Sequence, residues 1–460
     1  MATIIKRKKK YSVVYYYDDE KGEKRQKWET YNTSAEAKRR KAEVENQQIQ
    51  GTFIPPQDVL VKDFLYDFVK IYGTNHWALS TYQSNCALIA NYINPIIGNL
   101  PIQSINAKSV DEYYQTLKKT KSVVRKNRKP KSEYVTDGVI NSIHKVLRCA
   151  FDQAVKWELI GKNPFPLANR PKTEYKKRDI WDSATIRIAL DGCKDPKLYI
   201  AMNLAFACSM RSGEISGLQW PNVHISDSDI AADDAYVIID KELARVSKDA
   251  RQLLDEKDII QVFPSMMNGT STNLVLKKPK TDSSIRKVWL PKTLAYILRK
   301  WKKEQDEVKS FFGNEYYDYN LVVTLPNGRP CENRVIEKEF NKLKERLNLP
   351  NVVFHSLRHS STTYKLKLNN GDIKATQGDT GHSQIDMITD VYAHILDEDR
   401  KVNAQKFEEA FYANCDLRTV TPPGSKESPE LNNIVQALKN SPELTSMLSN
   451  LIAQAAASSK

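Results

Sequence analysis

The sequence contains few cysteines and no long apolar run. Its six cysteines are scattered over 460 residues without a CxxC pair, so we expect neither a zinc site nor a disulfide framework. Scattered cysteines of this kind are typical of buried thiols in a reducing compartment. The first residues, MATIIKRKKK, lack the apolar stretch of a signal peptide, and nowhere do 18 apolar residues follow one another. These absences predict a cytoplasmic chain that does not enter a membrane.

Acidic residues are outnumbered by basic ones. The chain has 70 Lys and Arg residues against 56 Asp and Glu residues, which gives a net charge of +14 and a pI of about 9.2. This excess favours a polyanionic partner, although solubility alone explains part of it. At roughly 150 residues per domain, the length predicts about three domains.

The amino-terminal 52 residues predict a small module of strands and one helix. Residues 13–17 are β-branched or aromatic, an Asp-Asp-Glu-Lys-Gly turn follows, and residues 24–30 resemble a returning strand. Thr33 or Ser34 can cap a helix that ends at Gly51. The basic residues of the module suit a phosphate backbone or else form a solvated basic face. The candidates for DNA contact are Lys8, Lys9, Lys10, Arg25 and Lys27.

A helical region follows Pro55-Pro56. Apolar residues recur at helical spacing in residues 58–72, 78–93, 107–118 and 133–157. Between the last two helices lies KKTKSVVRKNRKPK (118–131), which has eight basic residues and no acidic one. Such a run is either a mobile loop or a loop that faces DNA. Its candidates for DNA contact are Lys118, Lys119, Lys121, Arg125, Lys126 and Arg128.

The polar, basic stretch RPKTEYKKRD (170–179) predicts a domain boundary. Beyond it, helical and strand patterns are mixed, and after TPPGSKESPE comes an amphipathic tail with two Ser-Pro-Glu helix starts. The apolar stripes of this tail either fold back on their own protomer or dock on a neighbour. We expect helices at 195–208, 292–308, 333–347, 355–368 and 397–412, and strands near 236–240, 273–278 and 285–290.

Four of the seven histidines gather at 355, 359, 382 and 394. His355 and His359 are four residues apart and could share one helix face as zinc ligands, but Ser356 stands where a zinc protease needs its glutamate. No cysteine or carboxylate cluster adds further ligands, so we expect no metal. Packing in a core suits His359 and His394. It does not explain Arg358, because an unpaired charge is costly to bury.

A phosphodiester explains the arginine better. Its two free oxygens suit the planar forks of two arginines, and Arg211 in CSMRSGEISGLQW is the second candidate. Glu214 could hold Arg211 in place or be an ordinary helix carboxylate. A third cation, Lys280 in KKPKTDSSIRKVWLP, is predicted at the tip of a strand–turn–strand unit, where an ammonium can reach a leaving oxygen.

With these residues the chain resembles the tyrosine recombinases of the phage integrase family. The family pattern is an arginine before GE-x-x-x-L, a hairpin lysine, H-x-L-R-H, G-H and a tyrosine about ten residues later. Thr380 departs from it, because a leucine commonly precedes the G-H pair. Residues 225–272 are longer than in minimal members, so Lys277, Lys278 and Lys287 compete with Lys280. The matching residues are Arg211, Glu214, Lys280, His355, Arg358, His359, Gly381, His382 and Tyr392.

The resemblance implies a multidomain α+β fold. Residues 1–52 would form an arm-type DNA-binding domain with a three-stranded sheet and a helix. Residues 57–165 would form a helical, SAM-like core-binding domain. Residues 174–412 would form a mainly α catalytic domain with a small sheet, and residues 413–460 an amphipathic helical tail.

The resemblance also implies a chemistry that needs no cofactor. Tyr392 would attack a DNA phosphate to give a 3′-phosphotyrosine, while Arg211 and Arg358 neutralise the phosphate oxygens. Lys280 would protonate the leaving 5′-oxygen. His355 would be the general base, His382 a hydrogen-bond donor to the phosphate, and His359 a brace for the helix. Tyr364, on the helix of Arg358, is the rival nucleophile.

The biological role implied is the integration and excision of a mobile element or prophage through a Holliday junction. Its partners would be core-type and arm-type attachment sites, three further copies in a tetramer, an excisionase and a host DNA-bending protein, in the bacterial cytoplasm at the nucleoid. An Xer-like resolvase or inversion recombinase is the alternative, but those lack the arm module. A DNA-binding regulator with an inactive site is disfavoured, because all six catalytic positions are filled.

Overall fold

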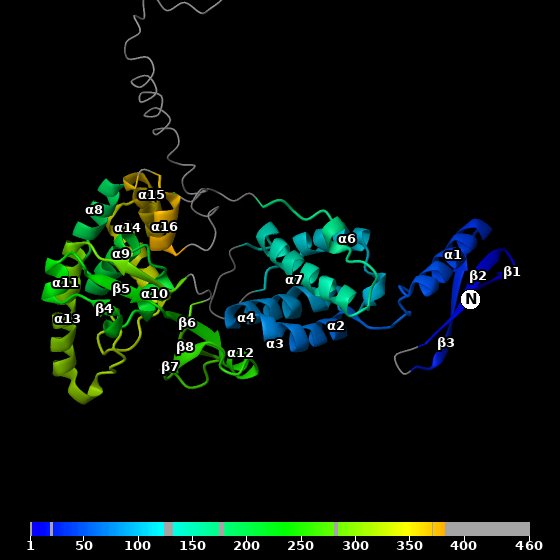
Figure 1. Ribbon diagram of the computed structural model, residues 1–460, viewed down its shortest axis with the longest axis horizontal. Coiled ribbons are helices and arrows are strands. Elements are labelled where there is room, and N and C mark those ends of the chain that lie inside the picture. The colour runs from blue at the N-terminus through cyan, green and yellow to red at the C-terminus, as the bar shows by residue number, and fades with distance from the viewer. Residues whose placement is uncertain are drawn as a thin grey trace, which may run out of the picture. The chain divides into compact units, whose positions relative to one another are not determined.

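The computed structural model describes residues 2–18, 22–123, 132–173, 179–279, 284–369 and 371–381. These residues form a sheet-and-helix module, a helical region and a region of helices with two small sheets (Figure 1). The α+β class expected from the sequence is confirmed. The predicted helix at 397–412 and the tail lie outside the described residues. None of the described helices is long and apolar enough to cross a bilayer.

The amino-terminal module is an antiparallel sheet in the order β1-β2-β3, followed by one helix. Its elements are β1 (Thr3–Arg7), β2 (Lys10–Asp18), β3 (Lys24–Tyr31) and α1 (Ser34–Gln50). The helix begins as predicted, since the Thr33 side chain accepts a hydrogen bond from Glu36 N and the Glu36 carboxylate accepts one from Thr33 N. It ends at Gly51, whose φ of 67° is the left-handed conformation that favours glycine.

The two faces of this sheet differ. Val13 and Tyr15 of β2 are fully buried in one cluster with Ala37 and Val44 of α1. Residues on the opposite face include Trp28, which is paired with Val14 across the strands and carries the Arg7 guanidinium 4.6 Å from its ring. The apolar face therefore holds the helix, and the other face carries aromatic and basic groups.

Helices fill the second region as the apolar spacing predicts. Phe64, Phe68, Leu147 and Phe151 lie in its buried core, and the Tyr114 hydroxyl lies 2.6 Å from His144 Nδ1. Two of the predicted helices continue as π-helical turns. The elements are α2 (Val61–Asp67), η1 (Phe68–Gly73), α3 (Thr74–His76), α4 (Leu79–Leu88), η2 (Ile89–Ile93), α5 (Asn94–Ile97), η3 (Ile102–Ser104), α6 (Ala107–Lys119), α7 (Asp137–Lys156) and η4 (Phe165–Leu167).

The third region is built around the apolar helix α9, which packs against α10, α14 and α15. Its first elements are α8 (Ser183–Asp191), α9 (Pro196–Ala207), α10 (Ser212–Gly217), η5 (Trp220–Asn222), β4 (Val223–His224), α11 (Asp227–Ala231) and β5 (Tyr236–Ile239). Then come β6 (Glu242–Ser247), α12 (Lys248–Leu253), β7 (Ile259–Val262), β8 (Thr272–Lys277) and β9 (Arg286–Trp289). The last are α13 (Lys292–Phe312), η7 (Gly313–Glu315), α14 (Asn333–Leu347), α15 (Ser356–Leu368) and α16 (Ile373–Thr380).

One prediction about the strands is wrong. The sequence suggested that the strands near 273–278 and 285–290 form one strand–turn–strand unit. Instead β8 pairs with β6 and β7, whereas β9 pairs with β5 in the sheet β4-β5-β9. The long segment before β8, residues 225–272, contains β6 and β7, which pair with the two edges of β8. Val246, Ala250 and Val275 of this added sheet and its helix are buried in the same cluster as the helices of the second region.

Candidate active site

Arg358 lies in the first turn of α15 and is buried, with 1% of its surface exposed. Its Nη1 donates to the carbonyl oxygen of Ser209, and its Nη2 donates to the carbonyl oxygen of Thr380 at 2.6 Å. Two backbone segments far apart in sequence are therefore joined by one guanidinium.

Arg211 stands at the amino-terminal boundary of α10, directly after a sharp turn. Ser209 adopts a left-handed conformation there with φ of 51°, which is uncommon for a residue with a side chain, and its hydroxyl lies 2.6 Å from that of Ser361 in α15. Arg211 Nη2 donates to the carbonyl oxygen of Gly381 at 3.0 Å. Arg358 and Arg211 thus contact consecutive carbonyls of the turn that leads into His382.

Glu214 connects Arg211 to a further arginine that the sequence analysis missed. Its buried carboxylate accepts from Arg211 Nη1 at 2.7 Å and from the Arg211 backbone N at 2.9 Å. It also accepts from Arg286 Nη2 at 2.9 Å and Nη1 at 3.2 Å. Of the two sequence-based interpretations of Glu214, the structure therefore favours a partner of Arg211 over an ordinary helix carboxylate.

The electrostatics of this cluster follow from burial and from the excess of positive charge. Burial, together with the nearby Arg211 charge, lowers the pKa of Arg358. Burial alone would raise the pKa of Glu214, but the hydrogen bonds from Arg286 and the charges of both arginines hold that pKa below its ordinary value. One carboxylate thus faces several guanidinium groups, and an anion is the group that would balance them.

Two of the predicted histidines lie at the start of α15, the helix that carries Arg358. His355 precedes the first residue of the helix, and His359 follows one turn later. Their rings meet edge to face with centroids 4.8 Å apart. Among the described residues, no three His, Cys, Asp or Glu side chains lie together in a way that could hold a metal ion.

The competing lysines have different surroundings. Lys277 Nζ forms an ion pair with Glu242 at 2.5 Å. Lys287 lies over the rings of Tyr236 and Trp289, at 3.7 and 4.5 Å from their centroids. Lys278 donates its backbone N–H to Asp258 O. Lys280 lies outside the described residues, as do His382, Tyr392 and the DNA-contact candidates Arg125, Lys126 and Arg128.

The rival tyrosine, Tyr364, is held by local contacts. Its hydroxyl accepts a hydrogen bond from the backbone N of Ser183 at 2.8 Å, and its ring meets Phe206 edge to face. These contacts fix its hydroxyl to the start of α8.

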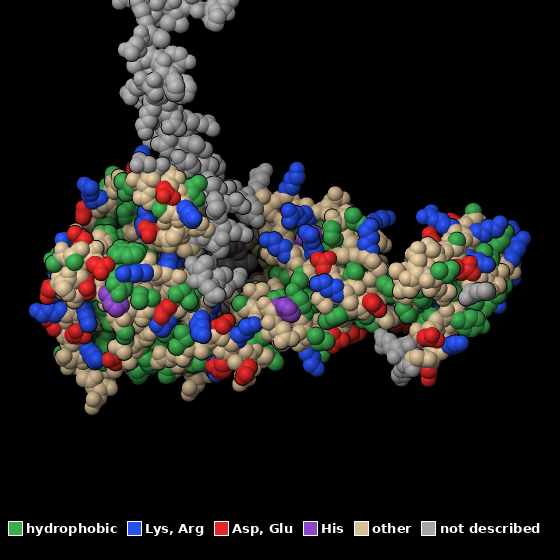
Figure 2. All heavy atoms as spheres, in the orientation of Figure 1, with side chains coloured by type: hydrophobic (Ala, Val, Ile, Leu, Met, Phe, Trp, Pro, Cys, Tyr) green, Lys and Arg blue, Asp and Glu red, His purple; other side chains and the backbone are tan. Residues whose placement is uncertain are grey.

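The described candidates for DNA contact are mostly exposed. Figure 2 shows Lys and Arg side chains over the amino-terminal module and the helical region on the face drawn. Lys118, Lys119 and Lys121 lie at and just beyond the end of α6. Lys10 belongs to the face of the amino-terminal sheet that α1 leaves open, whereas Arg25 and Lys27 are paired with Tyr17 and Tyr15, on the face that α1 covers. Those that are exposed are Lys8, Lys9, Lys10, Arg25, Lys118, Lys119 and Lys121.

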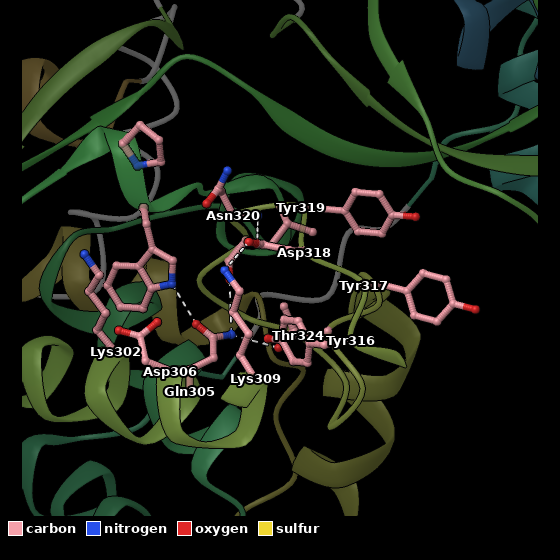
Figure 3. A pocket seen from close by; sticks show the side chains of 14 residues that line it. Lys302, Gln305, Asp306, Lys309, Tyr316, Tyr317, Asp318, Tyr319, Asn320 and Thr324 are labelled. Atoms are coloured by element: carbon pink, nitrogen blue, oxygen red, sulfur yellow. Dashed lines mark hydrogen bonds and ion pairs between the residues drawn. The ribbon is translucent and has the colours of Figure 1, made fainter. Parts of the chain in front are cut away.

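A separate cavity of about 270 Å³ is lined by residues of α13 and the loop after it (Figure 3). Trp220 Nε1 donates to Gln305 Oε1 at 2.6 Å, and Gln305 donates to Thr324 at 2.8 Å. None of the residues in the arginine cluster lines this cavity. Its polar groups hydrogen-bond to one another, and we assign it no ligand.

The chain is similar to proteins named as integrases and as a tyrosine recombinase. Residues 182–399 match the phage integrase family. A tyrosine recombinase XerC-like protein of Caldanaerobacter subterraneus subsp. tengcongensis is 24% identical, over 81% of this chain and 88% of the relative. The ICEBs1 integrase of Bacillus subtilis is 22% identical, over 71% of this chain and 77% of the relative. The integrase of the Tn1549 transposon, solved with a circular intermediate DNA, has the same fold over 76% of this chain and 99% of that chain, with a TM-score of 0.56 and 19% identity.

Proposed function

We propose that this chain, a tyrosine recombinase by its phage integrase family domain at residues 182–399, is the integrase of a mobile element or prophage. It cuts and rejoins DNA at specific sites. The observation that carries the proposal is the pair of guanidinium groups of Arg211 and Arg358, held on consecutive carbonyls directly before His382. The relatives named as integrases and a tyrosine recombinase support the reaction class.

The two arginines neutralise the phosphate. A transferring phosphoryl group spreads negative charge over its oxygens, and fixed donors stabilise that charge without reorganising. Arg358 is buried at a cost in free energy that an anion offsets. Arg211 is about one third exposed at its side chain and can reach a ligand from the open side.

Tyr392 is the nucleophile. Its attack forms a bond from its hydroxyl oxygen to phosphorus and releases the 5′-oxygen of the next nucleotide, so the phosphodiester energy is kept in a 3′-phosphotyrosine. The hydroxyl of a second strand reverses the step, and two such exchanges pass through a Holliday junction. The contact between Tyr364 and Ser183 favours Tyr392 over its rival.

Lys280 protonates the leaving 5′-oxygen. A lysine ammonium is an acid present at neutral pH. The ion pair of Lys277 with Glu242, and the packing of Lys287 on two aromatic rings, leave these two lysines committed elsewhere. His355 acts as the general base for Tyr392, His382 donates a hydrogen bond to the phosphate, and His359 braces α15 against His355.

DNA contacts extend over the other two regions. Residues 1–52 bind arm-type sites, and residues 57–165 bind core-type sites together with the catalytic domain, residues 174–412. Two binding modules on one chain raise affinity through effective concentration. A homotetramer on DNA, an excisionase and a host DNA-bending protein complete the proposed assembly. The alternative is an Xer-like reaction that uses no arm sites. The relative named XerC-like supports this alternative.

The test is covalent trapping on nicked core-site DNA, with the core site first mapped by footprinting on the DNA that flanks the gene. The intact chain should give a protein–DNA adduct that survives a denaturing gel. Tyr392→Phe should bind the same duplex and give none, because only a hydroxyl is lost. An adduct that persists in this variant moves the nucleophile elsewhere, with Tyr364→Phe as the next variant to test.

A further inference from the structure

We infer that Arg286 is a positioning residue that orients Glu214 and, through it, the phosphate-binding fork of Arg211. The inference rests on the proposed function, because it concerns the same site. Arg286 opens β9, and its side chain is 5% exposed against 2% for Glu214. Its guanidinium donates four hydrogen bonds to protein groups, so we place its effect on the substrate through those groups.

The geometry of the carboxylate carries the argument. Each oxygen of Glu214 accepts one hydrogen bond from Arg211 and one from Arg286. The Oε1 atom receives Arg211 Nη1 at 2.7 Å and Arg286 Nη1 at 3.2 Å. The Oε2 atom receives the Arg211 backbone N at 2.9 Å and Arg286 Nη2 at 2.9 Å. The carboxylate thus has one orientation that satisfies both arginines, and Arg286 supplies half of its bonds.

The charge balance explains why a second arginine is needed. A carboxylate as buried as Glu214 would be driven toward its neutral form. A protonated Glu214 accepts from Arg211 less strongly and no longer offsets its charge. The paired donors of Arg286 keep Glu214 ionised and fixed, as a bidentate fork does. Lysine at this position would keep the charge but lose the planar pair of donors.

Arg286 also supports the turn before His382. Its Nε donates to Asp379 O at 3.1 Å, and its Nη1 donates to Ser284 O at 3.1 Å. A Cβ at Gly381 would lie 2.9 Å from Arg286 Nη1, and Gly381 has φ of +61°. The guanidinium therefore contacts α10, the segment before β9 and the last turn of α16, three segments that meet at the proposed active site.

The experiment compares Arg286→Lys with Arg299→Lys in the full-length chain, using the mapped core-site duplex in nicked form as the probe. Arg299 is an arginine of α13 that pairs with Asp227 at the surface, so it is a matched control. Arg286→Lys should form the covalent adduct about 100-fold more slowly, the loss expected from a misplacement of about 1 Å. Its affinity for the core site should be unchanged. Arg299→Lys should match the intact chain in both assays.

A double-mutant cycle tests whether Arg286 acts through Glu214. If it does, Arg286→Lys should cost little further rate in a Glu214→Gln background, because coupled residues are not additive. Rate losses that multiply would overturn the inference, as would a normal cleavage rate in Arg286→Lys. So would a joint loss of binding and cleavage in that variant, since that marks a general structural role. A failure of the intact chain to form any adduct would overturn the proposed function instead.

Discussion

At the residue scale, the site depends on the shape of the guanidinium as much as on its charge. Arg358 donates to Ser209 O and Thr380 O with two different nitrogens, and Arg211 does the same with Glu214 and Gly381. Arg358→Lys and Arg211→Lys should each slow adduct formation by roughly 10²–10³-fold, as the loss of one fixed donor to an oxyanion does. The measurement is the single-turnover rate on nicked core-site DNA. A rate within a few fold of the intact chain would contradict the role of the fork.

The same residues predict how the reaction responds to chelators. Guanidinium and ammonium groups supply the positive charge that divalent metals supply in other phosphoryl transfers. EDTA should therefore leave adduct formation and strand exchange unchanged at constant ionic strength. The control is an equal concentration of a non-chelating carboxylate buffer, because DNA binding itself weakens with salt. Inhibition by EDTA that Mg²⁺ or Zn²⁺ reverses would overturn the mechanism.

The sequence alone predicted some residues of the candidate site and missed others. Arg358 stood out because an unpaired charge is costly to bury, and Arg211 because a phosphodiester suits a second planar fork. The structure brings both to the carbonyls of Thr380 and Gly381, with Glu214 bonded to Arg211. Arg286 was missed although it lies in the quoted segment SIRKVW. Its burial depends on Glu214, 72 residues earlier in the chain, and no local pattern reports a contact of that range.

At the scale of elements, the sequence predicted the features that depend on neighbouring residues, such as the start and end of a helix. The helix from Ser34 to Gln50 has the cap and the stop that the sequence indicated. The sheet made of β6, β8 and β7 was not anticipated as a unit, and β8 was assigned the wrong partner. Strand pairing depends on which edges meet in space, and short apolar runs do not specify their neighbours.

The amino-terminal module should lose stability in acid because of Glu29. Burial opposes ionisation, but hydrogen bonds from Arg40, Tyr15 and Tyr31 lower the pKa of Glu29 from 4.5 to about 2. Because the pKa of Glu29 is lower in the folded than in the unfolded chain, its ionised form stabilises the fold. This stabilisation is complete above the pKa of the unfolded chain and is lost as the pH falls from 4.5 towards 2. The contribution is about 2 kcal/mol after allowance for partial exposure.

Hydrogen exchange of the β2 and β3 amides in the full-length chain measures this effect. Protection should fall between pH 4.5 and 2 in the intact chain, and Glu29→Gln should remove the excess protection above pH 4.5. Glu23→Gln, which removes an exposed carboxylate paired with Arg25, is the matched control and should behave like the intact chain. Protection in Glu29→Gln equal to that of the intact chain would contradict the role given to this network.

Removal of residues 1–52 tests whether this module carries the proposed arm-site binding. The module has its own buried core of Val13, Tyr15, Ala37 and Val44, and none of the residues proposed for catalysis belongs to it. The shortened chain should bind core-site DNA as before and fail to shift arm-site DNA on native gels. Arg7→Ala with Trp28→Ala in the intact chain is a milder test of the open sheet face. Arm-site binding that survives the deletion would favour the Xer-like role.

At the scale of the whole molecule, recombination needs more than one active site. One protomer cuts one strand, so two duplexes require four protomers whose cleavage is coordinated. Coordination requires a contact that passes between protomers, and closed rings are the usual way to satisfy every such contact. The segment after the proposed catalytic domain has apolar residues at helical spacing.

Residues 425–460 of the tail lie outside the described residues. In SPELNNIVQALKNSPELTSMLSNLIAQAAASSK, each Ser-Pro-Glu predicts the start of a helix with proline in the first turn, and the apolar residues of each predicted helix recur at the spacing of one face. The first stripe is Leu431, Ile434, Val435 and Leu438, and the second is Leu444, Met447, Leu448, Leu451 and Ile452. We expect these stripes to dock on a neighbouring protomer.

Deletion of residues 425–460 should then weaken synapsis and strand exchange between two full sites. Core-site binding by single protomers should survive. Cleavage of a half-site should also continue, although it would no longer be coordinated between protomers. A full-length chain with Leu448→Ser and Leu451→Ser removes part of the second stripe, and Ser446→Ala with Ser449→Ala is its matched control between the same residues. Only docking between protomers would couple their active sites. Normal strand exchange by the deletion chain would therefore contradict this docking.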